Sequence, residues 1–223
     1  MNSKMSSVLG LIVIVTVSLI LVGHVDAADC GLNLPSTPVT IEVWNGTESY
    51  YETLLSNVPS GYDVTNRTYL GWCVDRRCVM PRSPATHQVT LFSSCNPPSD
   101  LAGQKWDMVN YVLNHRQGVA EDVQQALWYF VNLVGNYSPS SPTAWSMIND
   151  ANLNGEGFVP ETGQVIAVIC YTTDPKTQIT IVEVDNPPPI PEFQSFLVLS
   201  PFMIATLLAV IVYRRKRVST ESR

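Results

Sequence analysis

Alternation of apolar and polar residues along the chain predicts a set of short β-strands. The first candidate, PVTIEVW, ends at Asn45-Gly46, a sequence typical of a turn. The others are rich in valine, threonine and aromatic residues, which favour strands. The last two flank Asp174-Pro175, and we expect them to pair as a hairpin. The candidate strands are residues 38–44, 63–74, 87–94, 164–172 and 177–184.

In the middle of the chain the apolar period becomes that of a helix. Apolar residues recur on one face of residues 102–115, and a second helix is predicted over 120–134. A third covers 142–152, where Pro142 suits the first turn. Strands, grouped helices and further strands indicate an α+β fold, a β-rich domain with an insert of two to three helices.

Both ends of the chain have the patterns of targeting segments. Lys4, a long apolar run and a small residue at Ala27 are typical of a cleaved signal peptide, with an uncleaved anchor as the alternative. Near the other end, an apolar run is long enough to span a bilayer, and the basic residues behind it favour a cytoplasmic end. The expected organisation is a signal peptide (1–27), an ectodomain (28–186), a Pro-rich linker (187–195), a transmembrane segment (196–213) and a basic tail (214–223).

This C-terminal arrangement resembles the PEF-CTERM sorting signal of archaeal surface proteins. The resemblance lies in Pro191, Glu192 and Phe193, followed by the apolar segment and the basic run 214–217. It implies cleavage by an archaeosortase-like enzyme and transfer to a lipid anchor, by the logic of a GPI signal. A permanent single-pass anchor is the alternative. Either way, we expect a cell-surface protein held at the cytoplasmic membrane with its ectodomain outside.

The charge of the ectodomain restricts its partners. Residues 28–186 contain seven basic and 16 acidic side chains, which argues against nucleic acid or anionic lipid. The same region holds three N-glycosylation sequons, at Asn45, Asn66 and Asn136. On an exported chain each is a candidate glycan site and therefore a surface position.

Two adjacent glutamines in the second predicted helix face different environments. At 100° per residue, Gln124 falls within the apolar sector formed by Leu127, Trp128 and Val131, whereas Gln125 falls on the polar edge and is expected to face solvent. A buried amide without partners costs about 1–3 kcal/mol. We therefore expect a group near Gln124 to use its hydrogen-bonding capacity.

The number of cysteines is odd, which in an oxidising compartment indicates a free or reactive thiol, or an intermolecular bridge. Their spacing does not match a metal site, and we expect neither a metal nor a cofactor. With Cys73 set aside, the others suffice for two disulfides of open connectivity. The five are Cys30, Cys73, Cys78, Cys95 and Cys170.

Two segments resemble the motifs of bacterial thioester domains: YLGWCVD (69–75) and VQQALW (123–128). In that family the cysteine and the glutamine join as an internal thioester, through which a surface protein captures an amine-bearing target covalently. The resemblance implies a cross-link between Cys73 and Gln124, supported by Asp75 and Trp128.

The chain departs from the pattern of that family at several positions. Val123 and Leu127 replace a threonine and an isoleucine, Arg76 stands where proline is common, and Cys78 is an additional thiol. Residues 106–118 resemble the helix that precedes the glutamine motif, so the resemblance extends over about residues 65–135.

A purely structural interpretation of the same residues stays open. Gln124 would then be a core amide bonded to strand backbone, and Cys73 a disulfide partner of Cys78 or Cys95. The protein would be a structural cell-envelope glycoprotein without a thioester.

A cysteine–histidine nucleophile pair is a third possibility. It would join Cys73 to His87 or His115, but neither histidine lies in a supporting motif. We expect no catalytic residue and no enzyme. The favoured interpretation is a membrane-anchored covalent adhesin.

Overall fold

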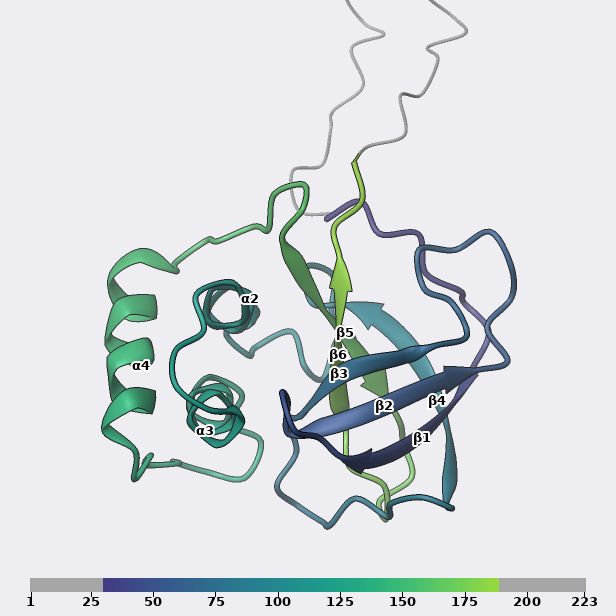
Figure 1. Cartoon of the computed structure of the whole chain (residues 1–223), viewed down its shortest axis with the longest axis horizontal. Coiled ribbons are helices and arrows are strands. Elements are labelled where there is room, and N and C mark those ends of the chain that lie inside the picture. Colours follow the sequence, from purple (N-terminus) through teal and green to yellow (C-terminus); the bar gives the residue numbers. More distant parts are fainter. Residues whose placement is uncertain (1–29, 189–223) are drawn as a thin grey trace, which may run out of the picture. The chain divides into compact units, whose positions relative to one another are not determined.

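The computed structural model describes residues 30–188 and contains a closed barrel of six antiparallel strands (Figure 1). The strands follow the order β1-β2-β3-β6-β5-β4 around the barrel, and β1 closes it by pairing with both β2 and β4. The strands are β1 (Val39–Asn45), β2 (Tyr51–Ser56), β3 (Thr68–Cys73), β4 (Thr86–Ser93), β5 (Val165–Tyr171) and β6 (Thr180–Asp185).

The predicted strands are all present, and one strand was missed. β2 was not predicted, although its residues alternate between buried and half-buried positions in the structure. The expected hairpin is confirmed, because β5 and β6 pair in antiparallel register, with Val168 opposite Val182. The strand predicted over 63–74 begins later, at Thr68.

Three helices are inserted between β4 and β5, as the sequence predicted. They are α2 (Trp106–Asn114), α3 (Ala120–Phe130) and α4 (Pro142–Asn154). In Figure 1 they group on one side of the barrel, and α2 contacts β5 while α3 contacts β3. α4 packs on α2 and α3, so those two helices separate it from the barrel.

The second helix ends earlier than expected, whereas the third begins where the sequence predicted. α3 ends at Phe130 rather than 134, because the following backbone turns away and the N–H of Asn132 donates to Gln104 Oε1 at 2.9 Å. α4 begins as expected at Pro142, and the Ser141 hydroxyl caps it by accepting from the N–H groups of Thr143 and Ala144.

Two hydrophobic cores meet at the wall of the barrel. One fills the barrel interior, and the other lies between the barrel and the helices. Successive strand residues point to opposite faces, so Trp72 joins the helix-side core while Cys73 joins the barrel interior. The end of β3 therefore carries a buried thiol next to the helical layer.

The expected signal peptide, PEF motif, transmembrane segment and basic tail lie outside the described residues. Within residues 30–188, none of the helices combines the length and apolar character needed to cross a bilayer.

Candidate functional site

Gln124 lies on the face of α3 that packs against the barrel. The helix is amphipathic, and the Asp122 carboxylate stabilises its first turn by accepting from the N–H of Val119 at 3.0 Å. The side chain of Gln124 is 0% exposed, as its place in the apolar sector predicted. α3 thus delivers a primary amide into the protein interior.

That amide meets the backbone of Cys73 at the end of β3. Gln124 Oε1 accepts from the N–H of Cys73 at 2.9 Å, and Gln124 Nε2 donates to the carbonyl of Cys73 at 2.6 Å. The pairing of β3 with β2 ends at Gly71, opposite Tyr51. Gln124 therefore takes the place that a further β2 residue would occupy, and the structure brings the two predicted cross-link residues together.

The thiol of Cys73 is buried and uncharged at neutral pH. Its Sγ donates to the carbonyl of Asp75 at 3.1 Å, and the residue is 1% exposed. Burial raises the pKa of this thiol to about 11, and the Trp128 indole and the Asp75 backbone offset only part of that rise. A thiolate here needs help from its surroundings.

Asp75 fixes the turn that follows Cys73. Its carboxylate accepts from the backbone N–H of Arg77 at 2.9 Å and from the guanidinium at 2.8 and 2.9 Å. Burial raises the pKa of Asp75, but these hydrogen bonds outweigh it and hold the pKa below its usual value. Asp75 is thus engaged with Arg77, and its contact with the thiol is through its backbone.

Trp128, one turn after Gln124, packs against the barrel core that contains Cys73. Its indole packs edge-on with Tyr50 at 5.6 Å and with Tyr137 at 5.4 Å between ring centroids. Neither tyrosine was a candidate from the sequence. Tyr50 precedes an unpredicted strand, and Tyr137 falls within a sequon. The sequence around each tyrosine therefore did not indicate that both contact Trp128.

Gln125 corrects the sequence prediction, because it is 7% exposed rather than solvent-facing. Its Oε1 accepts from the N–H groups of Ser140 and Ser141, at 2.8 and 3.1 Å. A helical projection of α3 alone could not show that the loop before α4 folds back over this edge.

The cysteines pair differently from the expectation of two disulfides. Cys30 and Cys95 form a disulfide, with their Cα atoms 5.8 Å apart, whereas Cys73, Cys78 and Cys170 are free. The proposed pairings of Cys73 with Cys78 or Cys95 are therefore wrong in this structure, and Cys73 carries a thiol.

Both histidines considered as partners of Cys73 make other contacts. The ring of His87 lies between the carbonyl of Pro81 and the Thr177 hydroxyl, at 2.9 and 3.1 Å. His115 stacks on Tyr111 and bonds its carbonyl. Neither ring hydrogen-bonds the thiol.

The sequon asparagines Asn45, Asn66 and Asn136 are all exposed, as glycan sites require. Across residues 30–188, histidine, cysteine and acidic side chains do not gather in groups of three that could hold a metal ion.

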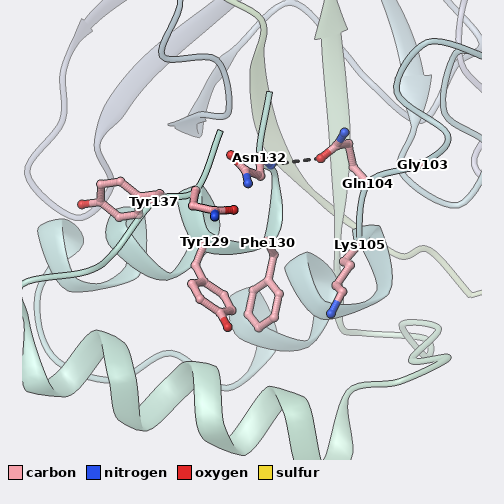
Figure 2. Close-up of a pocket in the computed structure, with 8 residues that line it drawn as sticks. Gly103, Gln104, Lys105, Tyr129, Phe130, Asn132 and Tyr137 are labelled. Atoms are coloured by element: carbon pink, nitrogen blue, oxygen red, sulfur yellow. Dashed lines mark hydrogen bonds between the residues drawn. The ribbon is translucent and has the colours of Figure 1, made fainter. Parts of the chain in front are cut away.

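A pocket of about 530 Å³ lies around the end of α3 (Figure 2). Neither Cys73 nor Gln124 lines it, but Tyr137 does, and Tyr137 also contacts Trp128. Figure 2 shows the Asn132–Gln104 hydrogen bond at its wall. Its lining comes from the segment before α2, the end of α3 and the loop after it, namely Gly103, Gln104, Lys105, Tyr129, Phe130, Asn132, Asn136 and Tyr137.

Comparisons with known proteins gave distant structural likenesses. No family model matches the chain, and no curated protein matches it. Among solved structures, it is similar to the N-terminal thioester domain of a surface protein from Clostridium perfringens (TM-score 0.43, 12% identity, 66% of this chain and 98% of that one). It is also similar to the N-terminal domain of the Streptococcus pyogenes pilus tip adhesin Cpa (TM-score 0.41, 11% identity, 68% and 96%). At these scores neither likeness decides the function of this chain.

Proposed function

We propose that residues 28–186 form a surface-displayed capture domain in which Cys73 and Gln124 join as an internal thioester. The observation that carries this proposal is the pair of hydrogen bonds between the Gln124 amide and the Cys73 backbone. An amide is a poor electrophile, so the reaction depends on holding it in fixed geometry beside the sulfur. Those two hydrogen bonds supply such a restraint, and the resemblance of both motifs to thioester domains agrees with it.

The bond forms when the Cys73 sulfur attacks the amide carbon of Gln124. The carbon–nitrogen bond breaks, and the nitrogen leaves as ammonia with the thiol proton. The Cys73 N–H already donates to Gln124 Oε1, so it can stabilise the negative charge that develops on this oxygen. Because both residues are buried, the thioester is shielded from hydrolysis.

Capture follows when a primary amine of an extracellular or cell-surface target reaches the thioester. The amine attacks the same carbon, the carbon–sulfur bond breaks, and the proton released by the amine returns to the sulfur. The product is an amide that joins Gln124 to the target. The only lysines of the ectodomain, Lys105 and Lys176, are exposed.

A structural cell-envelope glycoprotein without a thioester is the second candidate. The same two hydrogen bonds favour it, because they satisfy Gln124 and the Cys73 backbone without any reaction. Gln124 would then be a core amide that joins α3 to β3.

Intact mass of the unreduced domain separates the two candidates. We would produce residues 28–186, which include all the described strands and helices, without glycans. A capture domain lacks the mass of one ammonia, regains mass with methylamine, and shows no deficit as Cys73→Ala. Cys78→Ala is the matched control and should keep the deficit. If the Cys30–Cys95 disulfide alone explained the wild-type mass, the capture function would be excluded and the structural role would remain.

We also propose that the chain is anchored through its C-terminal segment and processed at Pro191, Glu192 and Phe193 by an archaeosortase-like enzyme. The order of motif, apolar segment and basic run supports this. The test is the C-terminal peptide of the cell-associated protein. Loss of residues after the motif in wild type, but not in Glu192→Ala/Phe193→Ala, is expected. An intact basic tail in wild type would favour a permanent anchor.

A further inference from the structure

A line of contacts leads from the segment after β3, across the loop after α3, to the buried thiol. It begins at Arg76, three residues after Cys73. The Arg76 guanidinium lies over the ring of Tyr137, 4.5 Å from its centroid, and donates to the carbonyl of Gly135 at 3.1 Å. One side chain thus ties the loop after α3 to the cysteine segment.

The next contact holds the indole of Trp128. Tyr137 packs against it at an interplanar angle of 74°, and Tyr50 packs against it at 73°. Edge-to-face packing is a favoured arrangement of two aromatic rings, because the positive edge of one ring meets the negative face of the other. Two such partners restrict the orientation of the indole, and Arg76 restricts one of those partners.

The indole nitrogen of Trp128 is buried and makes no hydrogen bond within the described residues. Unpaired buried donors are rare and call for an explanation. Trp128 follows Gln124 by four residues, so both lie on the same face of α3. The indole also lowers the pKa of the Cys73 thiol, even though it meets no hydrogen-bond geometry with the uncharged sulfur. Trp128 also packs against the barrel core that contains Cys73, which places this unused donor near the reacting sulfur.

The sulfur needs such a donor only when it is charged. As a thiol it donates to the carbonyl of Asp75, a contact that a thiolate cannot make. A charged sulfur occurs twice in the proposed reaction, first as the nucleophile that attacks Gln124 and then as the group that an amine displaces.

We propose that Arg76 and Tyr137 are positioning residues, which hold the Trp128 indole N–H against the Cys73 sulfur to stabilise its thiolate. The part played in capture rests on the proposed thioester, whereas the stabilisation of the thiolate does not. The chain thereby uses an arginine, which cannot itself react with the thioester, to order the aromatic residues around Trp128.

Other titratable groups also face the thiol. The negative charges of Asp75 and Cys78, which lie on its own segment, raise its pKa. The charge of Cys73 raises the pKa of Tyr50, just before β2, and of Tyr51, the first residue of β2. Glu121 raises the pKa of Tyr50 and Arg82 lowers it. The test keeps all of these groups and changes only Trp128 and its supports.

The experiment measures the alkylation of Cys73 by iodoacetamide against pH, resolved by peptide mass so that Cys78 and Cys170 do not contribute. Wild type and every variant are first treated with methylamine, which leaves the thiol free whether or not a thioester had formed. Trp128→Phe keeps the ring but removes the donor, so its profile should move to higher pH. Each unit of that shift should slow alkylation at a fixed pH by about threefold, because lower thiolate content is partly offset by higher nucleophilicity.

Variants of Tyr137 and Arg76 test whether these residues position the Trp128 indole. Tyr137→Ala and Arg76→Ala should shift the profile in the same direction, and Tyr137→Phe should restore wild-type behaviour because the ring suffices. Arg67→Ala is the control, since Arg67 lies over Tyr69 at 4.4 Å, away from the thiol, and should leave the profile unchanged.

Trp128 could instead only shield the Cys73 sulfur from solvent, without donating a hydrogen bond to it, and the alkylation profiles would then differ from those expected. Alkylation of the variants would then become faster at every pH with no shift of the profile, and this result would overturn the proposal. A wild type that shows no ammonia deficit would remove the capture reaction but leave the pH profile measurable, so the two failures can be told apart.

Discussion

The side-chain amide of Gln124 hydrogen-bonds both the N–H and the carbonyl of Cys73, at 2.9 and 2.6 Å. One side chain therefore extends the edge of β3 from a helix 51 residues further along the chain. The contact stabilises the fold, and it also places an amide beside a thiol. These two consequences can be separated by removing the thiol before the amide is changed.

In a Cys73→Ala background, Gln124→Met should lower the free energy of unfolding by about 2–6 kcal/mol. The alanine keeps both backbone partners but excludes the thioester, so only the hydrogen bonds are lost. Two buried backbone groups are then left unpaired, at about 1–3 kcal/mol each. Urea unfolding of the single and double variants measures the difference.

Gln117→Met in the same background is the control, because Gln117 is exposed and its substitution should change stability by less than about 0.5 kcal/mol. A Gln124→Met effect as small as that of the control would mean that water or a rearranged strand replaces the amide.

Local periodicity predicted most strands and helices of this fold, but not the closure of the strands into a barrel. The burial of Gln124 followed from its angle on α3, and each predicted strand is present. The missed strand, β2, is short and follows two exposed residues, Thr47 and Glu48. Closure of the barrel depends on the pairing of β1 with β4, a long-range contact that no local pattern encodes.

The candidate site could be predicted only as far as its motifs. Cys73 and Gln124 were found from their own segments, whereas Tyr50, Tyr137 and Arg76 contact Trp128 or one another through tertiary structure alone. Disulfide pairing likewise required the fold, because Cys30 meets Cys95 across 65 residues.

Gln125→Leu should release the loop that precedes α4. Gln125 Oε1 is the acceptor for the N–H groups of Ser140 and Ser141, and leucine cannot replace it. We expect faster hydrogen exchange at these two amides and a loss of about 1–2 kcal/mol in unfolding free energy. Gln125→Glu keeps an acceptor and should preserve protection. Equal exchange in both variants would show that these hydrogen bonds do not hold the loop.

Removal of the disulfide as Cys30→Ala/Cys95→Ala should lower the unfolding free energy by about 2–4 kcal/mol. The bond closes a 65-residue separation, for which loop entropy gives an upper value of about 4 kcal/mol. Chemical unfolding with and without a reductant tests this, since reductant should destabilise wild type and not the double variant. Cys78→Ala, which alters a free cysteine, should respond to reductant as wild type does.

Glu183 should make stability depend on pH in a direction opposite to that of a typical ion pair. Its carboxylate accepts from the Trp72 indole at 2.7 Å and from Arg116 at 2.9 Å, and its side chain is 4% exposed. Burial nevertheless raises the pKa of Glu183, and Arg116 and Trp72 offset only part of the rise.

A carboxyl whose pKa is raised on folding favours the folded state while it is protonated. Its contribution is therefore complete below the unfolded pKa, near 4.5, and is lost as the pH rises through the folded value. Glu183→Gln does not titrate, so the stability of wild type minus that of Glu183→Gln should decrease between pH 4 and pH 7. The decrease should be about 1.4 kcal/mol for each unit of pKa shift. Urea unfolding at several pH values measures it, with the exposed Glu161→Gln as control. A difference that grows with pH would instead mean that Arg116 outweighs burial and that the ion pair stabilises the barrel.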